Sequence, residues 1–227
     1  MTTTNNLDAW KGDPYIQTLN GKFFFRRPEE SDLSLDTIAA ALSRTCRFNG
    51  HVSCFYSVAQ HSCQVADITM TLTKDPRIAL AGLLHDAPEA YIGDVTSPLK
   101  AILGSAYKSL EGPILEAIFR KYGLGDLVIA FRLPEVIHDA DMIALATEKR
   151  DFLPEDPVPW SVLDGYKPTD EITVAWAPQE AQRQFLSRFA LLNGLIQESE
   201  RRILTPDEAL HPFAEDYRSE GGACGLV

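Results

Sequence analysis

The sequence predicts a single all-α domain with a short hairpin near its amino-terminal end. Apolar residues recur at helical spacing through most of the 227-residue chain. Strand signals are confined to the aromatic run at 23–25 and to the segment 171–176. No internal repeat and no long charge run marks a linker. We therefore expect about five to seven helices around one core.

The same signals divide the chain into three regions. Residues 1–30 are expected to form an N-terminal extension, in which an Asn-Gly turn signal before the aromatic run suits a short hairpin. Residues 31–205 are expected to form the helical domain, with the proline-rich stretch near 153–168 as an insertion into it. Residues 206–227 are expected to be a flexible tail.

The first predicted helix covers residues 35–46. Its apolar residues fall on one stripe, and Ser34 or Ser31 is available as the N-cap. The glycine-containing segment 47–51 that follows is expected to be a loop.

The next two helices carry recognisable start signals. Ser57 and Gln60 form a capping-box pattern ahead of an apolar stripe. Asp75 and Pro76 are a cap followed by a first-turn proline, and the helix that they open should kink or break at Pro88. Gly93 and Pro98 then indicate a loop.

Three further helices are expected in the second half. They cover about residues 107–124, with Gly123 as a stop, then 133–153 and 178–202. Between the last two, a stretch with four prolines at 154–171 predicts a long loop.

The charge balance limits the classes of partner. A formal net charge of −11 without a compensating basic patch argues against nonspecific nucleic-acid binding, because such a chain repels a phosphate polymer. An anionic small molecule would have to be bound by a few placed cations or by a metal ion. We therefore expect a small-molecule ligand.

The sequence also favours a cytoplasmic location without membrane insertion. No window holds 18 uninterrupted apolar residues, and the first fifteen residues lack the basic start and apolar core of a secretion signal. The cysteines show neither a CxxC pair nor a disulfide framework, so we expect reduced thiols at Cys46, Cys54, Cys63 and Cys224.

Three predicted helices each place imidazole or carboxylate groups on an apolar face. These groups are His61, the pair His85 and Asp86, and Asp141. A lone histidine on such a face is often a core residue, but several unpaired buried groups would cost roughly several kcal/mol each. Two imidazoles and two carboxylates together suit zinc, manganese, cobalt or iron. We therefore expect these four side chains to hold one divalent ion.

A second His-Asp pair offers a competing assignment for the last ligand. Asp141 shares the apolar side of its predicted helix, whereas Asp139 lies on the opposite flank, and we therefore prefer Asp141. His138 and Asp139 are then a solvated pair, or Asp139 supports a ligand imidazole.

The order of these groups resembles the H…HD…D signature of the HD-domain metal-dependent phosphohydrolases, an all-α fold. The segment HDAPEAYIGD at 85–94 is similar to HD-x-x-E-x3-GD in bacterial 5′-deoxynucleotidases. The motif order also resembles that of phage dATP triphosphohydrolases, which act where 2-aminoadenine replaces adenine. The resemblance covers roughly residues 33–150. It implies that Glu89 positions or protonates around the attacking water and that Asp94 contacts the sugar side of the substrate.

The resemblance also implies a set of substrate-binding residues. Arg47 and Phe48 fall where the deoxynucleotidases carry an Arg-Trp pair that contacts phosphate and sugar, with Phe in place of Trp here. Asn49 would press on base or sugar. Pro98 and Lys100 fall where the triphosphohydrolases line their pocket.

The function that the resemblance implies is a dATP triphosphohydrolase that releases deoxynucleoside and triphosphate. Zinc, cobalt or manganese would be the cofactor, with magnesium as an option for the phosphates. One alternative is a 5′-deoxynucleotidase acting on deoxynucleoside monophosphates, and another is a non-catalytic binding module of the same fold. The resemblance further implies a homo-oligomer, either a dimer or a hexamer.

Overall fold

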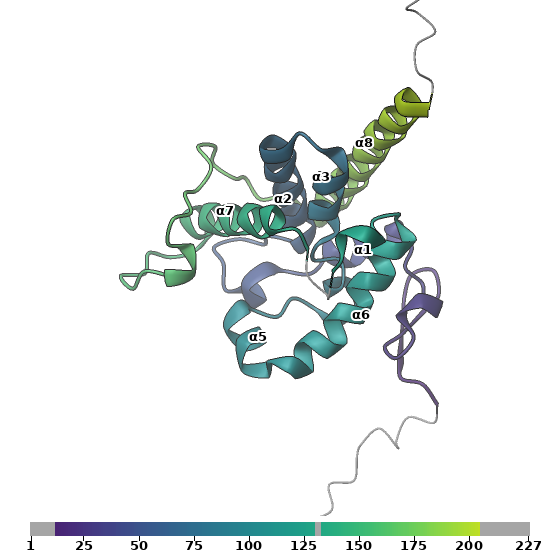
Figure 1. The fold of residues 1–227 in the computed structure, drawn as a ribbon. Helices are drawn as coiled ribbons and strands as arrows, with labels where there is room; N and C mark the ends of the chain where they lie inside the picture. The colour runs from purple at the N-terminus through teal and green to yellow at the C-terminus, as the bar shows by residue number, and fades with distance from the viewer. Residues whose placement is uncertain (1–11, 130–132, 205–227) are drawn as a thin grey trace, which may run out of the picture.

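The computed structural model describes residues 12–129 and 133–204, and within these ranges the regular secondary structure is helical apart from one small hairpin (Figure 1). The predicted all-α class with an N-terminal hairpin is confirmed. The strands are β1 (Tyr15–Gln17) and β2 (Lys22–Phe24). The α-helices are α1 (Leu35–Leu42), α2 (Val58–Thr73), α3 (Pro76–Leu84), α4 (Glu89–Ile92), α5 (Ser97–Leu103), α6 (Ser105–Lys121), α7 (Glu135–Phe152) and α8 (Pro178–Leu204).

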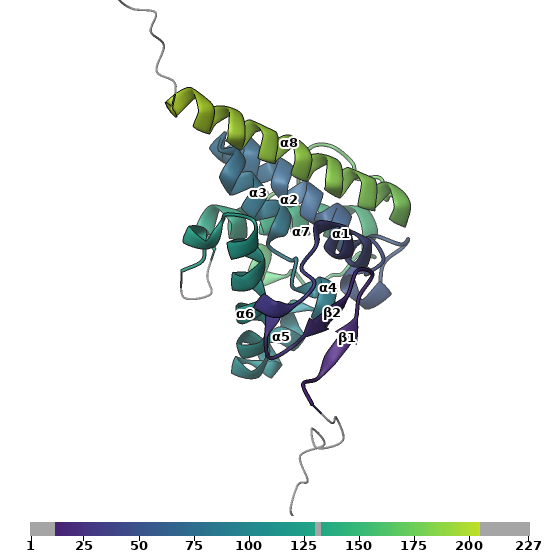
Figure 2. The same ribbon diagram turned by 90° about the vertical axis from the view of Figure 1, so that its right-hand side faces the viewer.

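Helix α2 is the centre of the core. It packs against α3, α7 and α8, and Figure 2 shows α8 running along the side of the molecule where α1, α2 and α3 lie. The α2–α3 contact is close because Gly82 faces Thr69: a Cβ at Gly82 would lie 2.9 Å from Thr69 Oγ1. This packing sets the position of the segment that follows α3.

Local start and stop signals explain the boundaries around that segment. The Ser57 hydroxyl accepts a hydrogen bond from Gln60 N at 3.2 Å, and Asp75 Oδ1 accepts one from Arg77 N at 2.8 Å, so both predicted caps are confirmed. The predicted break at Pro88 is also confirmed, since α3 ends at Leu84 and α4 begins directly after the proline.

The predicted hairpin is present and is attached to the helical core. β1 and β2 pair in antiparallel register, with Tyr15 opposite Phe24. Phe23 is fully buried, and its ring stacks on the ring of Tyr91 in α4 with centroids 3.9 Å apart. The hairpin thus contributes an aromatic side chain to the same core as the helices.

The segment 171–176, which carries a strand signal, does not form a strand. Its backbone is bonded instead to the side chain of Gln60, whose amide nitrogen donates to Val174 O and whose carbonyl accepts from Trp176 N, both at 2.8 Å. The side chain of a helical residue therefore makes backbone hydrogen bonds that a neighbouring strand would make in a sheet. The strand propensity is present, but no strand lies beside it in the described parts of the chain.

Other boundaries differ more modestly. The first helix ends at Leu42, before the predicted 46, and residues 97–103, expected to be loop, form α5. The short helices α4 and α5 raise the number of α-helices in the described residues to eight, above the expected five to seven. The proline-rich stretch has no regular structure longer than the 3-10 turn at Ser161–Leu163.

Two expectations touch residues that are only partly described. The three cysteines within the described ranges are unpaired, as expected, whereas Cys224 and the predicted tail lie outside those ranges. Over the helices that the structure describes, none combines the length and apolarity needed to cross a membrane.

We predict that Phe23→Ala lowers the free energy of unfolding by about 3–5 kcal/mol, because the substitution leaves a cavity beside Tyr91. Tyr15→Ala is the control, since Tyr15 lies on the same hairpin but is 39% exposed. Urea unfolding followed by circular dichroism measures both. Equal, small losses for the two variants would show that the hairpin is not part of the folding unit.

Candidate metal centre

Four of the predicted ligands meet at one place, although they come from α2, the turn after α3 and α7. Nε2 of His61 lies 3.3 Å from Nε2 of His85, 3.4 Å from Asp86 Oδ2 and 3.2 Å from Asp141 Oδ1. The ligand atoms of His61, His85 and Asp86 all lie within 4.8 Å of one another, and Asp141 joins them through His61. We call these four residues the metal cluster.

The two imidazoles are held so that the same ring atom faces the cluster. His61 Nδ1 lies 2.6 Å from Glu148 Oε1, and His85 Nδ1 lies 2.7 Å from the carbonyl oxygen of Gly82. A carbonyl or an ionised carboxylate can only accept a hydrogen bond, so both Nδ1 atoms carry the proton. Each Nε2 is therefore the ring atom that faces the cluster. It can donate to Asp86 or Asp141 while it carries a proton, and it can coordinate a cation once that proton is lost.

The acidic members of the cluster are ionised. Burial acts to raise the pKa of Asp86, but the charge of His85 and the hydrogen bond with His61 outweigh it and hold that pKa well below its usual value. Burial also acts to raise the pKa of Asp141, and the hydrogen bond and charge of His61 again lower it. Two carboxylates and two imidazole nitrogens at these distances match the donor set of a divalent ion, so the residues fit the expected cofactor.

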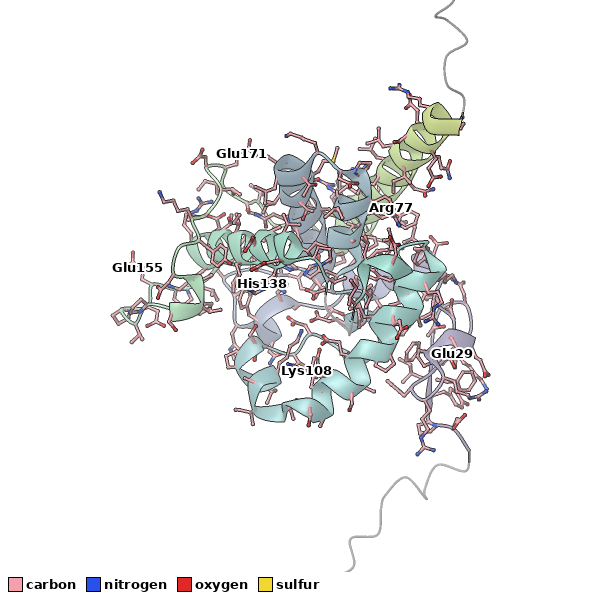
Figure 3. The ribbon with its side chains drawn as sticks, viewed as in Figure 1. Glu29, Arg77, Lys108, His138, Glu155 and Glu171 are labelled. Atoms are coloured by element: carbon pink, nitrogen blue, oxygen red, sulfur yellow. The ribbon has the colours of Figure 1, made fainter. Side chains whose placement is uncertain are left out.

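A fifth residue of the centre, Glu148, was missed by the sequence reasoning. It lies in α7, seven residues after Asp141, which is two helical turns and therefore the same face of the helix. This spacing is present in the sequence, but Asp139 of the nearby His138-Asp139 pair was considered instead as the carboxylate that supports a ligand imidazole. Asp139 instead accepts a hydrogen bond from Tyr166 at 2.8 Å, and His138, labelled in Figure 3, is exposed.

Glu89 lies in α4 beside the cluster and is almost completely buried. Its Oε1 accepts a hydrogen bond from Lys100 Nζ at 3.0 Å, while its Oε2 is buried and has no hydrogen-bond partner among the described residues. Burial and the negative charge of Asp86 raise the pKa of Glu89 well above its usual value, and Lys100 opposes them. One carboxylate oxygen is thus left for a water molecule or a substrate atom.

The predicted cations both contact acidic groups of the centre. Arg47 is buried, with Nη2 2.9 Å from Glu148 Oε2 and Nη1 3.6 Å from Asp86 Oδ2. Lys100 reaches both Glu89, at 3.0 Å, and Glu111, at 3.5 Å. Arg47 is therefore held inside the centre, whereas Lys100 is partly exposed at its edge.

Of the remaining predicted residues, Asp94 and Phe48 lie near the centre. Burial raises the pKa of Asp94, and Arg47 opposes that rise. The guanidinium carbon of Arg47 lies 5.3 Å from the ring centroid of Phe48. Phe48 and Asn49 have φ of 55° and 52°, a left-handed conformation that such residues seldom adopt, so the loop is strained next to the centre. Asn49 is exposed, as is Pro98 in the first turn of α5.

Comparison with known proteins identifies the family to which the chain is similar. A model of the HD domain matches residues 58–122, which include α2, α3, α4, α5 and α6. The chain is 38% identical over 183 residues to the uncharacterized protein YfdR of Escherichia coli (strain K12), covering 80% of this chain and 97% of YfdR. It is also 33% identical over 125 residues to an uncharacterized protein of Rhodobacter capsulatus, covering 53% of this chain and 63% of that protein.

We predict that Asp86→Asn weakens divalent-metal binding by about 10–100-fold or more. Loss of a carboxylate that only supports a ligand typically costs about 10–100-fold, and Asp86 is a proposed ligand itself. The substitution removes the negative charge that lies 3.2 Å from His85 and 3.4 Å from His61. Titration with cobalt, followed by visible absorption, measures the dissociation constant. Asp126→Asn, which changes an exposed carboxylate paired with Arg77, is the matched control and should bind cobalt like the wild type.

Proposed function

Because the chain belongs to the HD-domain family of metal-dependent phosphohydrolases, we propose that it hydrolyses deoxynucleoside triphosphates, with dATP as the expected substrate and deoxynucleoside and triphosphate as products. The observation that supports a hydrolase best is the convergence of the metal cluster with a buried carboxylate, Glu89, that keeps one oxygen without a partner among the described residues. A centre that served structure alone would have no need of that neighbouring acid.

The metal cluster would hold zinc, cobalt or manganese, with magnesium as a further option for the phosphates. When bound, such an ion supplies a Lewis acid that polarises a phosphoryl oxygen and makes water more acidic. His61, His85, Asp86 and Asp141 are the residues that would hold it.

Glu89 would manage the proton of the attacking water. Its Oε2, which has no partner in the described part of the chain, can accept a hydrogen bond from the water. The raised pKa of Glu89 lets it take up the proton as the water oxygen bonds to the α-phosphorus. The bond from that phosphorus to the 5′ oxygen then breaks. The proton passes to the 5′ oxygen, which leaves as the hydroxyl of the deoxynucleoside.

Two cations would hold the phosphates with charge-assisted bonds. Lys100 is the better placed, because it is partly exposed and bridges two carboxylates that a polyphosphate could displace. Arg47 would add its Nη1, which faces Asp86. Phe48 and Asn49 would contact base or sugar, Asp94 the sugar, and Pro98 the pocket wall. Close contact at the sugar would exclude a ribose 2′-hydroxyl.

A 5′-deoxynucleotidase acting on monophosphates is the second candidate. It is favoured by the engagement of Arg47 with Glu148, which leaves Lys100 as the more accessible of the two proposed phosphate-binding cations. One cation suits one phosphate group better than three. Both candidates break the same bond between the α-phosphorus and the 5′ oxygen. They differ in whether triphosphate or orthophosphate is released with the deoxynucleoside, so their products distinguish them.

The decisive measurement is chromatography of the products formed from each deoxynucleoside triphosphate and monophosphate, with cobalt, manganese, zinc or magnesium added. We expect deoxyadenosine and triphosphate from dATP. Orthophosphate from the monophosphates alone would favour the second candidate. Metal binding without any hydrolysis would leave the non-catalytic binding module.

We predict that Glu89→Gln lowers kcat by about 10²–10⁴-fold, because an amide cannot take up the proton of the attacking water. Its metal content should stay unchanged, since Glu89 is not among the proposed ligands. Steady-state assays with metal analysis of the same samples measure both. Glu116→Gln, on the surface of α6, is the control, and an equally active Glu89→Gln enzyme would exclude the proposed role.

We predict that Lys100→Met moves the acidic limb of the kcat/KM profile to higher pH. The Lys100 ammonium lowers the pKa of Glu89, so its removal raises that pKa further, and Glu89 then loses its proton only at a higher pH. Measuring kcat/KM across the pH range locates the acidic limb, because weaker substrate binding lowers the whole profile without moving that limb. A limb at the wild-type position would show that Glu89 does not set it.

A further inference from the structure

Glu148 is a buried acid that the proposed reaction does not use directly. It has no exposed surface, and both of its oxygens are engaged. Oε1 accepts a hydrogen bond from His61 Nδ1 at 2.6 Å, and Oε2 accepts from Arg47 Nη2 at 2.9 Å and Nε at 3.3 Å. A charge buried so completely is retained only when its partners offset the desolvation.

The contacts of Glu148 close a ring around one side of the centre. Glu148 contacts His61 and Arg47; Arg47 Nη1 lies 3.6 Å from Asp86 Oδ2, and Asp86 Oδ2 lies 3.4 Å from His61 Nε2. The Arg47 backbone is fixed as well, since its N–H donates to Tyr56 O at 2.9 Å. The Glu148 carboxylate thus contacts one proposed ligand, His61, directly and reaches another, Asp86, through Arg47.

Glu148 is not itself a ligand of the ion. It lies against Nδ1 of His61, whereas His85, Asp86 and Asp141 all approach Nε2, which is on the other side of the imidazole ring. Its remaining oxygen is directed to Arg47. Glu148 can therefore influence a bound cation only through His61 and through Arg47.

Resting on the metal site of the proposed function, we propose that Glu148 is a positioning residue: it keeps the His61 proton on Nδ1, turns the Nε2 lone pair toward the ion, and fixes Arg47 against Asp86. A carboxylate behind a ligand imidazole makes the imidazole a stronger donor and fixes its ring. Arg47 offsets the charge that this arrangement buries. The function of Arg47 in this inference is to hold the centre, in addition to any contact with phosphate.

Glu148→Gln tests the proposal because glutamine keeps the shape and one accepting oxygen but removes the charge. Cobalt titration should give a dissociation constant about 10–100-fold weaker than that of the wild type. Asp139→Asn is the matched control, since it changes a carboxylate to an amide on the same helix and that carboxylate accepts its hydrogen bond from Tyr166 instead. Thermal melts of the metal-free proteins establish that each variant is folded at the titration temperature, so a structural loss alone cannot produce the weaker binding.

A second measurement needs no variant and decides the question if Glu148→Gln does not fold. In zinc-loaded wild type with nitrogen-15 histidine, His61 should show a protonated Nδ1 and a zinc-bound Nε2. Zinc on Nδ1 would overturn the proposal. In the cobalt titration, it would be overturned by equal affinity in the wild type and a folded Glu148→Gln, or by an equal loss of cobalt affinity in Asp139→Asn and Glu148→Gln. A wild type that binds no divalent ion would overturn the proposed function as well, whereas the other results overturn the inference alone.

Discussion

The structure depends on one constraint: charged groups that are removed from water must be offset by one another or by a cation. His61, Glu148 and Arg47 have little or no exposure, and each would cost several kcal/mol if left alone. Their partners lie far apart in the sequence, since Glu148 is 87 residues from His61 and 101 from Arg47. The contact between α2 and α7 is therefore fixed by polar pairing as well as by apolar packing, and it specifies which faces of the two helices meet.

Much of the fold could be predicted because its signals are local. Ser57, Asp75 and Pro88 set helix boundaries through their own backbone or side-chain chemistry, whatever surrounds them. The strand signal at 171–176 does not produce a strand, because strand propensity reports a preference for extended backbone and says nothing of what satisfies its hydrogen bonds. Here the side chain of Gln60, more than a hundred residues away, does so.

The candidate site divides in the same way. His61, His85, Asp86 and Asp141 stood out because each is a polar group on an apolar helical face, and such a group requires a partner. Glu148 obeys the same rule, but an adjacent His-Asp pair competed for the supporting position. Arg47 pairs with Glu148, and Lys100 pairs with Glu89. The sequence offers each of these cations many other acidic residues as partners. Which carboxylate each cation meets is decided by the tertiary structure.

These pairings give the centre two sides with different physical character. On one side, Glu148, His61 and Arg47 are buried and mutually satisfied, so moving any of them would expose an unpaired charge. On the other, Lys100 extends from α5, none of whose residues is buried, and divides its ammonium between Glu89 and Glu111. A shared, partly exposed cation loses little when it exchanges one anion for another. An incoming phosphate could therefore draw Lys100 away from Glu89 and leave that carboxylate with a stronger hold on a proton, while the side that holds the ion stays unchanged.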